Sequence, residues 1–172
     1  MDLDDKQVAQ ATEARQEYFL EILGREPLAA FDGVLELIGV GLERDDFCVA
    51  IATSSTREKS EAVLRSAKIP YERMVYITGS DVKNKKPHPE LFQKTVAGLG
   101  LKCADCVVIE DAPNGIEAAK AAGCKAVGVM NSPASSETAD KLYGADLVVN
   151  SFVEINICDL RNLIDGKNAD YS

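Results

Sequence analysis

The sequence predicts an α/β protein built around a parallel sheet, and two observations support this. Short apolar runs without polar alternation, typical of strands covered on both faces, recur along the chain at 46–53, 74–78, 106–110, 125–130 and 146–149. Between them lie segments with helical periodicity, bounded by turn-forming glycines and prolines. Strands and helices that alternate in this way form a parallel sheet through right-handed crossovers. We therefore predict a Rossmann-like core of three layers, with helices on both faces of the sheet.

Composition limits what the protein can bind. The chain has 172 residues, of which 46% are hydrophobic and 27% charged, which fits one domain with a substantial core. Its net charge of −9 argues against nucleic acid or an anionic membrane as a partner. No apolar run approaches the length of a membrane span, about 18 residues, and the start of the chain does not resemble a signal peptide. We therefore expect a cytoplasmic protein.

The five cysteines do not form a recognisable metal motif. Cys103 and Cys106 make a C-x-x-C pair, but a zinc site needs a second pair or two histidines at suitable spacing. The chain has one histidine, His88, and no second pair. We interpret all five as reduced structural thiols, with a redox or metal role as the minor alternative.

The expected helices begin with an amphipathic segment at 4–23, which Gly24 should end. A second helix is expected at 34–42, with Asp32 as its N-cap. The remaining helical segments are expected at 56–67, after the lysine loop with Pro89 in the first turn, at 116–122 and at 136–143. The tail, 166–172, is expected to be disordered.

Two adjacent carboxylates, Glu110 and Asp111, end the strand at 106–110. Ligands of open parallel sheets bind just outside the carboxyl ends of the strands. Neighbouring acids repel each other unless a cation neutralises them, and carboxylate oxygens suit Mg²⁺. The alternative is that both residues only cap the following helix and interact with its dipole.

A run of hydroxyl side chains, Thr53 to Thr56, follows the strand at 46–53. Hydroxyls and free N–H groups at the start of a helix form an anion site. The alternative is again capping, because Ser55 and Glu58 have the spacing of a capping box.

Three lysines occupy the loop after the strand at 74–78, namely Lys83, Lys85 and Lys86. Loop lysines are usually solvated charges. Lys86 differs because Pro87 restricts the backbone of the residue before it. Lys86 is therefore the best candidate for an ammonium group held in one position.

At this point three segments resemble motifs of a known family. Ile-Ala-Thr-Ser-Ser (51–55), Lys-Lys-Pro-His-Pro-Glu (85–90) and Val-Val-Ile-Glu-Asp-Ala-Pro-Asn-Gly-Ile-Glu-Ala-Ala (107–119) resemble motifs II, III and IV of haloacid-dehalogenase-like hydrolases. The nearest branch is that of the β-phosphoglucomutase-like phosphatases and phosphomutases. The resemblance covers about residues 13–155, with the motifs in the family's order and spacing.

The resemblance implies a role for each candidate residue. Thr53 and Ser54 would bind the phosphoryl group, and Lys86 would stabilise its charge. Glu110 and Asp111 would hold Mg²⁺, directly or through water. It also implies two domains.

In that division residues 1–30 are the remnant of a mobile helical cap, and residues 31–165 form the α/β core. Arg15 falls where mutase-like members of the family carry a basic residue that faces the substrate.

One family motif has no counterpart here. Motif I, an apolar strand followed by Asp-x-Asp-Gly-Thr/Val, supplies the nucleophile and the general acid/base. Asp2 and Asp4 have the spacing, but no strand precedes them and no glycine follows. Asp32 has no second aspartate beside it and lies only 21 residues before Thr53. We therefore assign no nucleophile and expect this chain to be a piece of a longer enzyme.

The same resemblance places the motif I strand between the strands at 46–53 and 106–110, so its absence predicts a gap there. Two functions remain open. The chain is part of a Mg²⁺-dependent phosphoryl-transfer enzyme that acts on a small phosphorylated metabolite and is inactive alone. Alternatively, it is a non-catalytic relative that binds phosphate, dimerises, or accepts a partner's strand into the gap.

Overall fold

The structure, a computed structural model, describes residues 4–130 and 142–167. The helices are α1 (Asp5–Arg25), α2 (Val34–Leu42), α3 (Arg57–Ser66), α4 (Glu90–Leu99), α5 (Pro113–Ala122) and α7 (Ile157–Ile164). The strands are β1 (Ala50–Ala52), β2 (Val75–Ile77), β3 (Val107–Glu110), β4 (Lys125–Val129) and β5 (Leu147–Val149). Most of the helix predicted at 136–143 lies outside the described residues.

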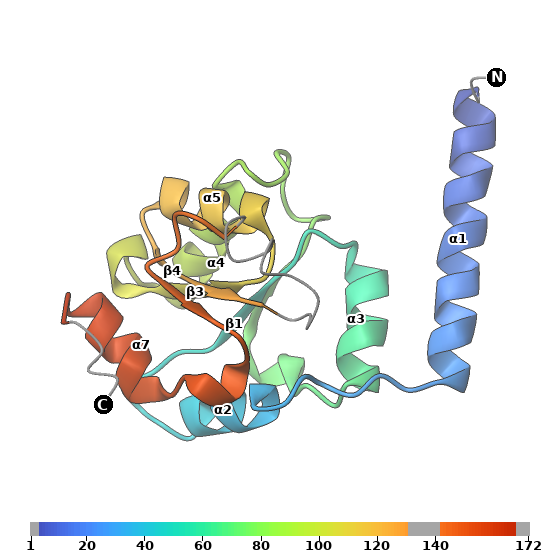
Figure 1. The fold of residues 1–172 in the computed structure, drawn as a ribbon. Helices are drawn as coiled ribbons and strands as arrows, with labels where there is room; N and C mark the ends of the chain where they lie inside the picture. The colour runs from blue at the N-terminus through green and yellow to red at the C-terminus, as the bar shows by residue number, and fades with distance from the viewer. Residues whose placement is uncertain (1–3, 131–141, 168–172) are drawn as a thin grey trace.

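The strands form the middle of three layers. Figure 1 shows α4 and α5 on the upper side of the strands and α2 and α7 on the lower side. An α5-side cluster fills the upper interface, with buried Phe92, Ile116, Ala118, Ala119, Ala126 and Leu142. An α7-side cluster fills the lower interface, with buried Val127, Val129, Val149, Ile155, Ile157 and Leu160. The predicted three-layer α/β architecture is confirmed.

Strand β4 shows why the apolar runs do not alternate with polar residues. Ala126 packs into the α5-side cluster, and Val127 and Val129 pack into the α7-side cluster. Each of these three side chains is at most 1% exposed. Because successive side chains of a strand point to opposite faces, a strand between two helical layers needs apolar residues throughout.

The strands fall into two groups. β1 pairs with β2, and β3, β4 and β5 form a second group, with every ladder parallel. Ala52 of β1 and Val108 of β3 pack against the same α5-side cluster, so both groups belong to one layer. Within residues 4–130 and 142–167, no strand pairs with the free edge of β1 or with that of β3. β1 and β3 do not pair with each other, as the prediction requires, and a missing strand between them stays a prediction.

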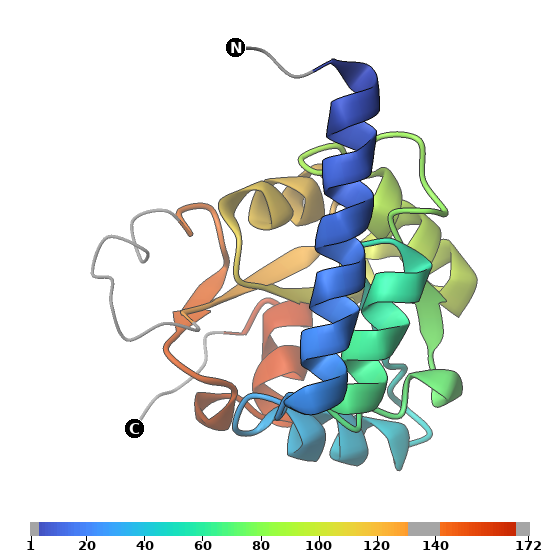
Figure 2. The same ribbon diagram turned by 90° about the vertical axis from the view of Figure 1, so that its right-hand side faces the viewer.

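Helix α1 stands apart from the three layers and packs along α3 (Figures 1 and 2). The ammonium of Lys59 lies 4.6 Å from the ring centre of Phe19. The N–H of Leu28, in the connection to α2, donates to Ser66 Oγ at 2.8 Å. No helix in the described part of the chain is long and apolar enough to cross a membrane.

Several predicted helix ends and N-caps differ from the structure. α5 begins at Pro113 instead of Ile116, and Pro89 is the N-cap of α4 instead of a residue of its first turn.

At α1 and α2 the difference is one or two residues. α1 continues through Gly24 to Arg25, because the N–H of Glu26 still bonds to Ile22 O. α2 has Gly33 as its N-cap instead of Asp32, and Gly33 adopts a φ of 86° that favours glycine.

The N-cap of α3 is also shifted. Thr56, and not Ser55, caps this helix by accepting from the N–H of Lys59. Ser55 belongs to the preceding turn, where its N–H donates to Thr53 Oγ1 and its carbonyl accepts from Gly79. The predicted capping box is therefore wrong.

Two further elements differ from the prediction: β1 is shorter than expected, and α7 was not expected at all. β1 is shorter than the run at 46–53, because its ladder to β2 covers only Ala50 to Ala52. α7 was not predicted, although Asn156 and Asp159 form its capping box. At the start of the predicted tail, Gly166 and Lys167 still form backbone hydrogen bonds to α7, and residues 168–172 lie outside the described residues.

Candidate active site

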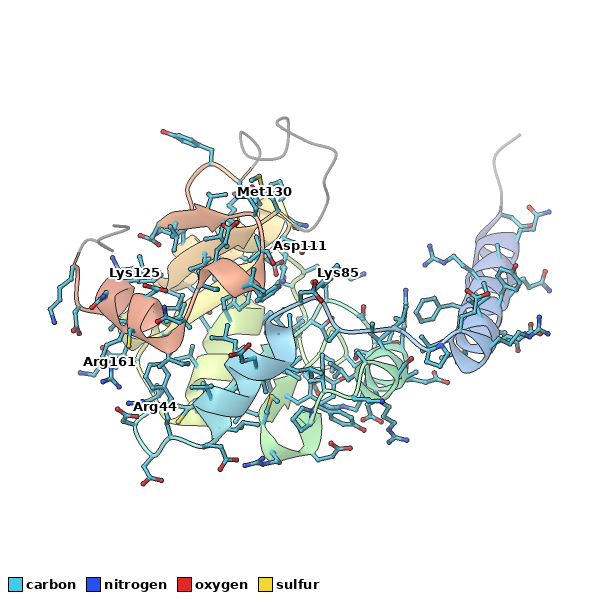
Figure 3. All side chains as sticks on the ribbon, turned by 60° about the horizontal axis from the view of Figure 1, so that its bottom comes forward. Arg44, Lys85, Asp111, Lys125, Met130 and Arg161 are labelled. Carbon is cyan, nitrogen blue, oxygen red and sulfur yellow. The ribbon has the colours of Figure 1, made fainter. Side chains whose placement is uncertain are left out.

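The carboxyl ends of β1 and β3 border one cavity of about 410 Å³. Its lining comes from three segments far apart in the sequence, namely Ala52, Thr53, Ser54 and Ser55, then Lys86, and then Glu110, Asp111, Ala112 and Asn114. Figure 3 shows the direction of the sheet, with Asp111 and Met130 after the carboxyl ends of β3 and β4 and Lys125 at the opposite end. The structure thus brings together Thr53, Ser54, Lys86, Glu110 and Asp111, as predicted.

Lys86 is the one lysine of its loop that is held in place. Its Nζ donates to Glu110 Oε1 at 2.7 Å, and the two side chains are only 8% and 15% exposed. The same ammonium lies 4.8 Å from the ring centre of Phe92, a buried residue of α4. Lys83 and Lys85 are exposed. The sequence-based distinction between Lys86 and its neighbours is therefore supported by the geometry.

Glu90 holds the backbone that leads to Lys86. Its carboxylate accepts from the N–H of Lys83 at 3.1 Å and from that of Asn84 at 2.9 Å, and it pairs with Lys94 at 3.1 Å. These hydrogen bonds, led by that from Lys83, lower the pKa of Glu90 to about 2 from 4.5. Glu90 thus anchors the lysine loop to the first turn of α4.

The two carboxylates after β3 have different surroundings. Burial raises the pKa of Glu110 above its usual value, with Lys86 acting against the shift and Asp111 adding to it. Asp111 is exposed at the cavity. The N-cap of α5 is Ala112, and no side chain caps this helix by a hydrogen bond. The capping alternative therefore does not explain why acids occupy these positions.

The hydroxyl turn, Thr53 to Thr56 after β1, is held by backbone hydrogen bonds to β2 and to the residues that follow β2. The N–H of Thr53 donates to Ile77 O at 3.0 Å, and that of Gly79 donates to Ser55 O at 2.9 Å. A Cβ atom on Gly79 would lie 2.3 Å from the carbonyl oxygen of Ser54, so only glycine fits. The sequence reading did not single out Gly79, since this contact joins two separate segments.

Other candidates do not reach the cavity. Arg15 is exposed on α1 and is not among the lining residues. Asp4 instead caps α1 in a reciprocal pair with Gln7, and Asp32 is exposed in the turn before α2. Asp2 lies outside the described residues. Conversely, Asn114 lines the cavity without having been assigned a role, although it belongs to a quoted motif. Ser55, which was considered as a cap of α3, also lines the cavity.

The donor set fits Mg²⁺ only in part. Glu110 and Asp111 offer the carboxylate oxygens that Mg²⁺ prefers, and this ion commonly keeps several waters. Within residues 4–130 and 142–167, no group of three or more His, Cys, Asp or Glu side chains is arranged to hold a metal ion. The five cysteines are free thiols, including the C-x-x-C pair.

Known proteins share this sequence pattern over a large part of the chain. Glycerol-1-phosphate phosphohydrolase 1 of Saccharomyces cerevisiae is 38% identical over 115 residues, which are 63% of this chain and 45% of the relative. Hexitol phosphatase A of Escherichia coli is 33% identical over 138 residues, 80% of this chain and 61% of the relative. The chain thus spans about half the length of these relatives.

A solved structure shares the fold. The crystal structure of a CbbY variant from Rhodobacter sphaeroides, in complex with xylulose-(1,5)bisphosphate, is 27% identical and superposes with a TM-score of 0.77. The match covers 92% of this chain and 71% of that protein. A family model described as haloacid dehalogenase-like hydrolase matches residues 2–129. Together with the parallel sheet and the cavity at its carboxyl edge, this match shows that the chain belongs to the haloacid dehalogenase-like hydrolases.

Proposed function

We propose that this chain is part of a Mg²⁺-dependent phosphoryl-transfer enzyme that acts on a small phosphate ester, a sugar phosphate in particular. The observation that carries the proposal is the buried Lys86–Glu110 pair beside the hydroxyl turn, in one cavity with Asp111. A cation, hydroxyl groups and carboxylates gathered at the carboxyl edge of a parallel sheet suit a phosphate ester. The names of the relatives, which describe phosphatases of glycerol and hexitol phosphates, support the substrate class.

Each residue of the cavity has a role in this proposal. Thr53 and Ser54 bind the phosphoryl oxygens through hydroxyl and N–H groups. Lys86 neutralises the negative charge that the phosphoryl group carries during transfer. Glu110 and Asp111 would hold Mg²⁺, which would supply positive charge to neutralise the phosphoryl group. A preorganised set of charges of this kind lowers the barrier because no reorientation is needed during the reaction.

Lys86 is suited to this role by its immobility. Its ammonium is confined between the carboxylate of Glu110 and the ring of Phe92, while Glu90 fixes the loop behind it. The carboxylate of Glu110 gives this largely buried ammonium a negative partner at 2.7 Å. A phosphoryl group entering the cavity would therefore meet a cation that is already in place.

The nucleophile and the general acid/base are proposed to come from outside these 172 residues. The described part of the chain offers Glu110 and Asp111 as its only cavity carboxylates, and both are assigned to the metal. β1 and β3 each have an edge that pairs with no described strand, and a strand that paired with both edges would end beside Thr53 and Glu110. An apolar strand followed by Asp-x-Asp would deliver its aspartates to this cavity. Arg15 would face the substrate only with the rest of a cap in place.

The test is phosphate release from a panel of small sugar phosphates, with and without Mg²⁺. The 172-residue chain is expected to show negligible turnover. The same chain extended at its N-terminus by an apolar strand and Asp-x-Asp-Gly-Thr is expected to become active. The matched control carries Asn in place of the first aspartate of the extension. Turnover by the unextended chain that is lost in Asp4→Asn or Asp32→Asn would contradict the proposal.

The open sheet edges favour one alternative, a non-catalytic protein that accepts a partner's strand or dimerises through the gap. Unpaired backbone groups at a sheet edge are ready to pair with another chain. The extension experiment separates the two functions. A chain that gains stability from the added strand but never hydrolyses any substrate of the panel is an interaction protein.

A further inference from the structure

We infer that Gly115 is a positioning residue that sets the carboxylate of Glu110 for its contact with Lys86. A Cβ atom built on Gly115 would lie 1.8 Å from Glu110 Oε1 and 2.2 Å from both Cδ and Cγ of Glu110. The Glu110 side chain therefore occupies the space into which a side chain at position 115 would project. Its Oε1 is the same atom that accepts the hydrogen bond from Lys86 at 2.7 Å.

The backbone does not explain a glycine at this position. Gly115 is not among the glycines with positive φ, and it lies inside the first turns of α5. Its N–H makes a regular bond to Ala112 O at 2.9 Å. In such a helical position alanine is more favourable than glycine. The contact with Glu110 is the feature of the structure that requires the missing side chain.

A substitution at Gly115 would displace Glu110 rather than α5. The next turn of the helix is fixed in the core, with Ile116 1% exposed and Ala118 and Ala119 fully buried. The Glu110 carboxylate is the mobile end of a flexible side chain. Moving it removes the acceptor from the Lys86 ammonium, which is 8% exposed and has no other carboxylate within salt-bridge distance in the described residues.

Gly115 therefore acts on the cavity through Glu110, and its importance for turnover rests on the proposed function above. The positional effect itself does not depend on turnover. Any residue larger than glycine at position 115 disrupts the buried ion pair between Lys86 and Glu110, which are 24 residues apart in sequence. The effect is specific to the site and not to the helix, because the same change elsewhere in a helix improves helix formation.

The experiment compares Gly115→Ala with Gly39→Ala in the full 172-residue chain. Gly39 lies inside α2 and has nothing within 4 Å of the position of an added Cβ, so it is a matched control. The NMR chemical shifts of the lysine side chains at one fixed pH, with Lys86 assigned through Lys86→Arg, report the surroundings of Lys86. We expect the Lys86 signals to move in Gly115→Ala in the same direction as in Glu110→Gln, because the ammonium loses its contact with the Glu110 carboxylate. We expect no change in Gly39→Ala.

Lys86 chemical shifts in Gly115→Ala that match those of the unsubstituted chain would overturn the inference. If Gly115→Ala unfolds, Glu110→Ala in the same chain should restore folding, since it removes all three atoms that clash. Failure to restore it would also overturn the inference. Failure of the phosphatase proposal would leave these readouts unchanged, whereas a true positioning role also predicts a lower kcat for Gly115→Ala in the active, extended chain.

Discussion

Thr53, directly after β1, and Glu110, the last residue of β3, line the same cavity. In the described part of the chain, β1 and β3 share no hydrogen-bond ladder. β1 pairs with β2 on one side, and β3 pairs with β4 on one side. The proposed phosphate-binding turn and the proposed metal ligands therefore lie on two groups of strands that do not pair with each other in the described residues. Their relative placement depends on helices α4 and α5, which pack on each other and on the two groups of strands.

The unpaired edges of β1 and β3 should be visible in amide hydrogen exchange. Amides of β1 and β3 that do not bond to β2 or β4 are expected to exchange quickly in the 172-residue chain, because no strand protects them. In the chain extended by an apolar strand and Asp-x-Asp-Gly-Thr, the same amides should become protected, while amides in β4 should change little. Slow exchange along both free edges before extension would show that the gap is already closed.

Breaking the buried ion pair should destabilise the fold. Lys86→Met leaves the Glu110 carboxylate without its cation, and removing one partner of a buried pair costs about 3 kcal/mol of unfolding free energy. The matched control is Lys94→Met, since the Lys94 side chain is 47% exposed and its pair with Glu90 should contribute less than about 1 kcal/mol. Urea unfolding at neutral pH measures both values, and equal losses would contradict the special position of Lys86.

The same variant should show a characteristic pH dependence. Burial already raises the pKa of Glu110 above 4.5, and loss of Lys86 removes the influence that opposes the shift. A carboxyl group with a raised pKa in the folded state favours folding below its unfolded pKa, and this advantage is lost as pH rises through the folded pKa. The deficit of Lys86→Met should therefore shrink when unfolding is measured near pH 4.5. A deficit independent of pH would contradict this cause.

Glu90 should have the opposite dependence. Its pKa is lowered to about 2 from 4.5 in the folded protein, so its contribution to stability is fully present above pH 4.5 and is lost as pH falls towards 2. The stability difference between the unsubstituted chain and Glu90→Gln should decrease over this range. NMR titration of the Glu90 carboxyl group provides the direct check, and a midpoint at 4.5 or above would refute the assigned hydrogen bonds.

Gly79→Ala should be more damaging than alanine at an unconstrained helical glycine. The new Cβ would lie 2.3 Å from the carbonyl oxygen of Ser54, which is backbone and cannot rotate away. We expect a loss of about 2 kcal/mol, the scale of strain from overpacking. Gly24→Ala, in α1 with nothing within 4 Å of its added Cβ, should instead be neutral or stabilising by up to about 1 kcal/mol. Thermal or urea unfolding of the two variants gives the comparison.

In the active, extended chain, Lys86→Ala and Asp111→Ala should each reduce kcat by about 10²-fold or more, the scale for loss of one preorganised charge. Lys102→Ala, at an exposed residue that does not line the cavity, is the control and should leave turnover unchanged. Steady-state kinetics on the best substrate of the panel measures the effect. Turnover that is insensitive to Lys86→Ala would overturn the assignment of the site.

The sequence by itself determined the elements of the core and the chemical identity of the cavity. Apolar runs such as 125–130 predict strands because a strand between two helical layers is apolar on both faces, and α2 was predicted at 34–42, as found. Thr53, Lys86, Glu110 and Asp111 could be identified because each stands at the end of such a run or beside a proline. These signals come from neighbouring residues in the sequence, so they can be recognised without knowledge of the fold.

Only the tertiary structure decided how these parts meet. The pairing of Lys86 with Glu110 and the contacts of Gly115 with Glu110 and of Gly79 with Ser54 join separate positions of the chain. Their distances depend on how strands and helices pack. The N-caps at Gly33 and Thr56 were missed because a shift of one residue depends on the conformation of the preceding turn. A sequence lists the charges and the small residues, but close packing decides which glycine makes room for which carboxylate.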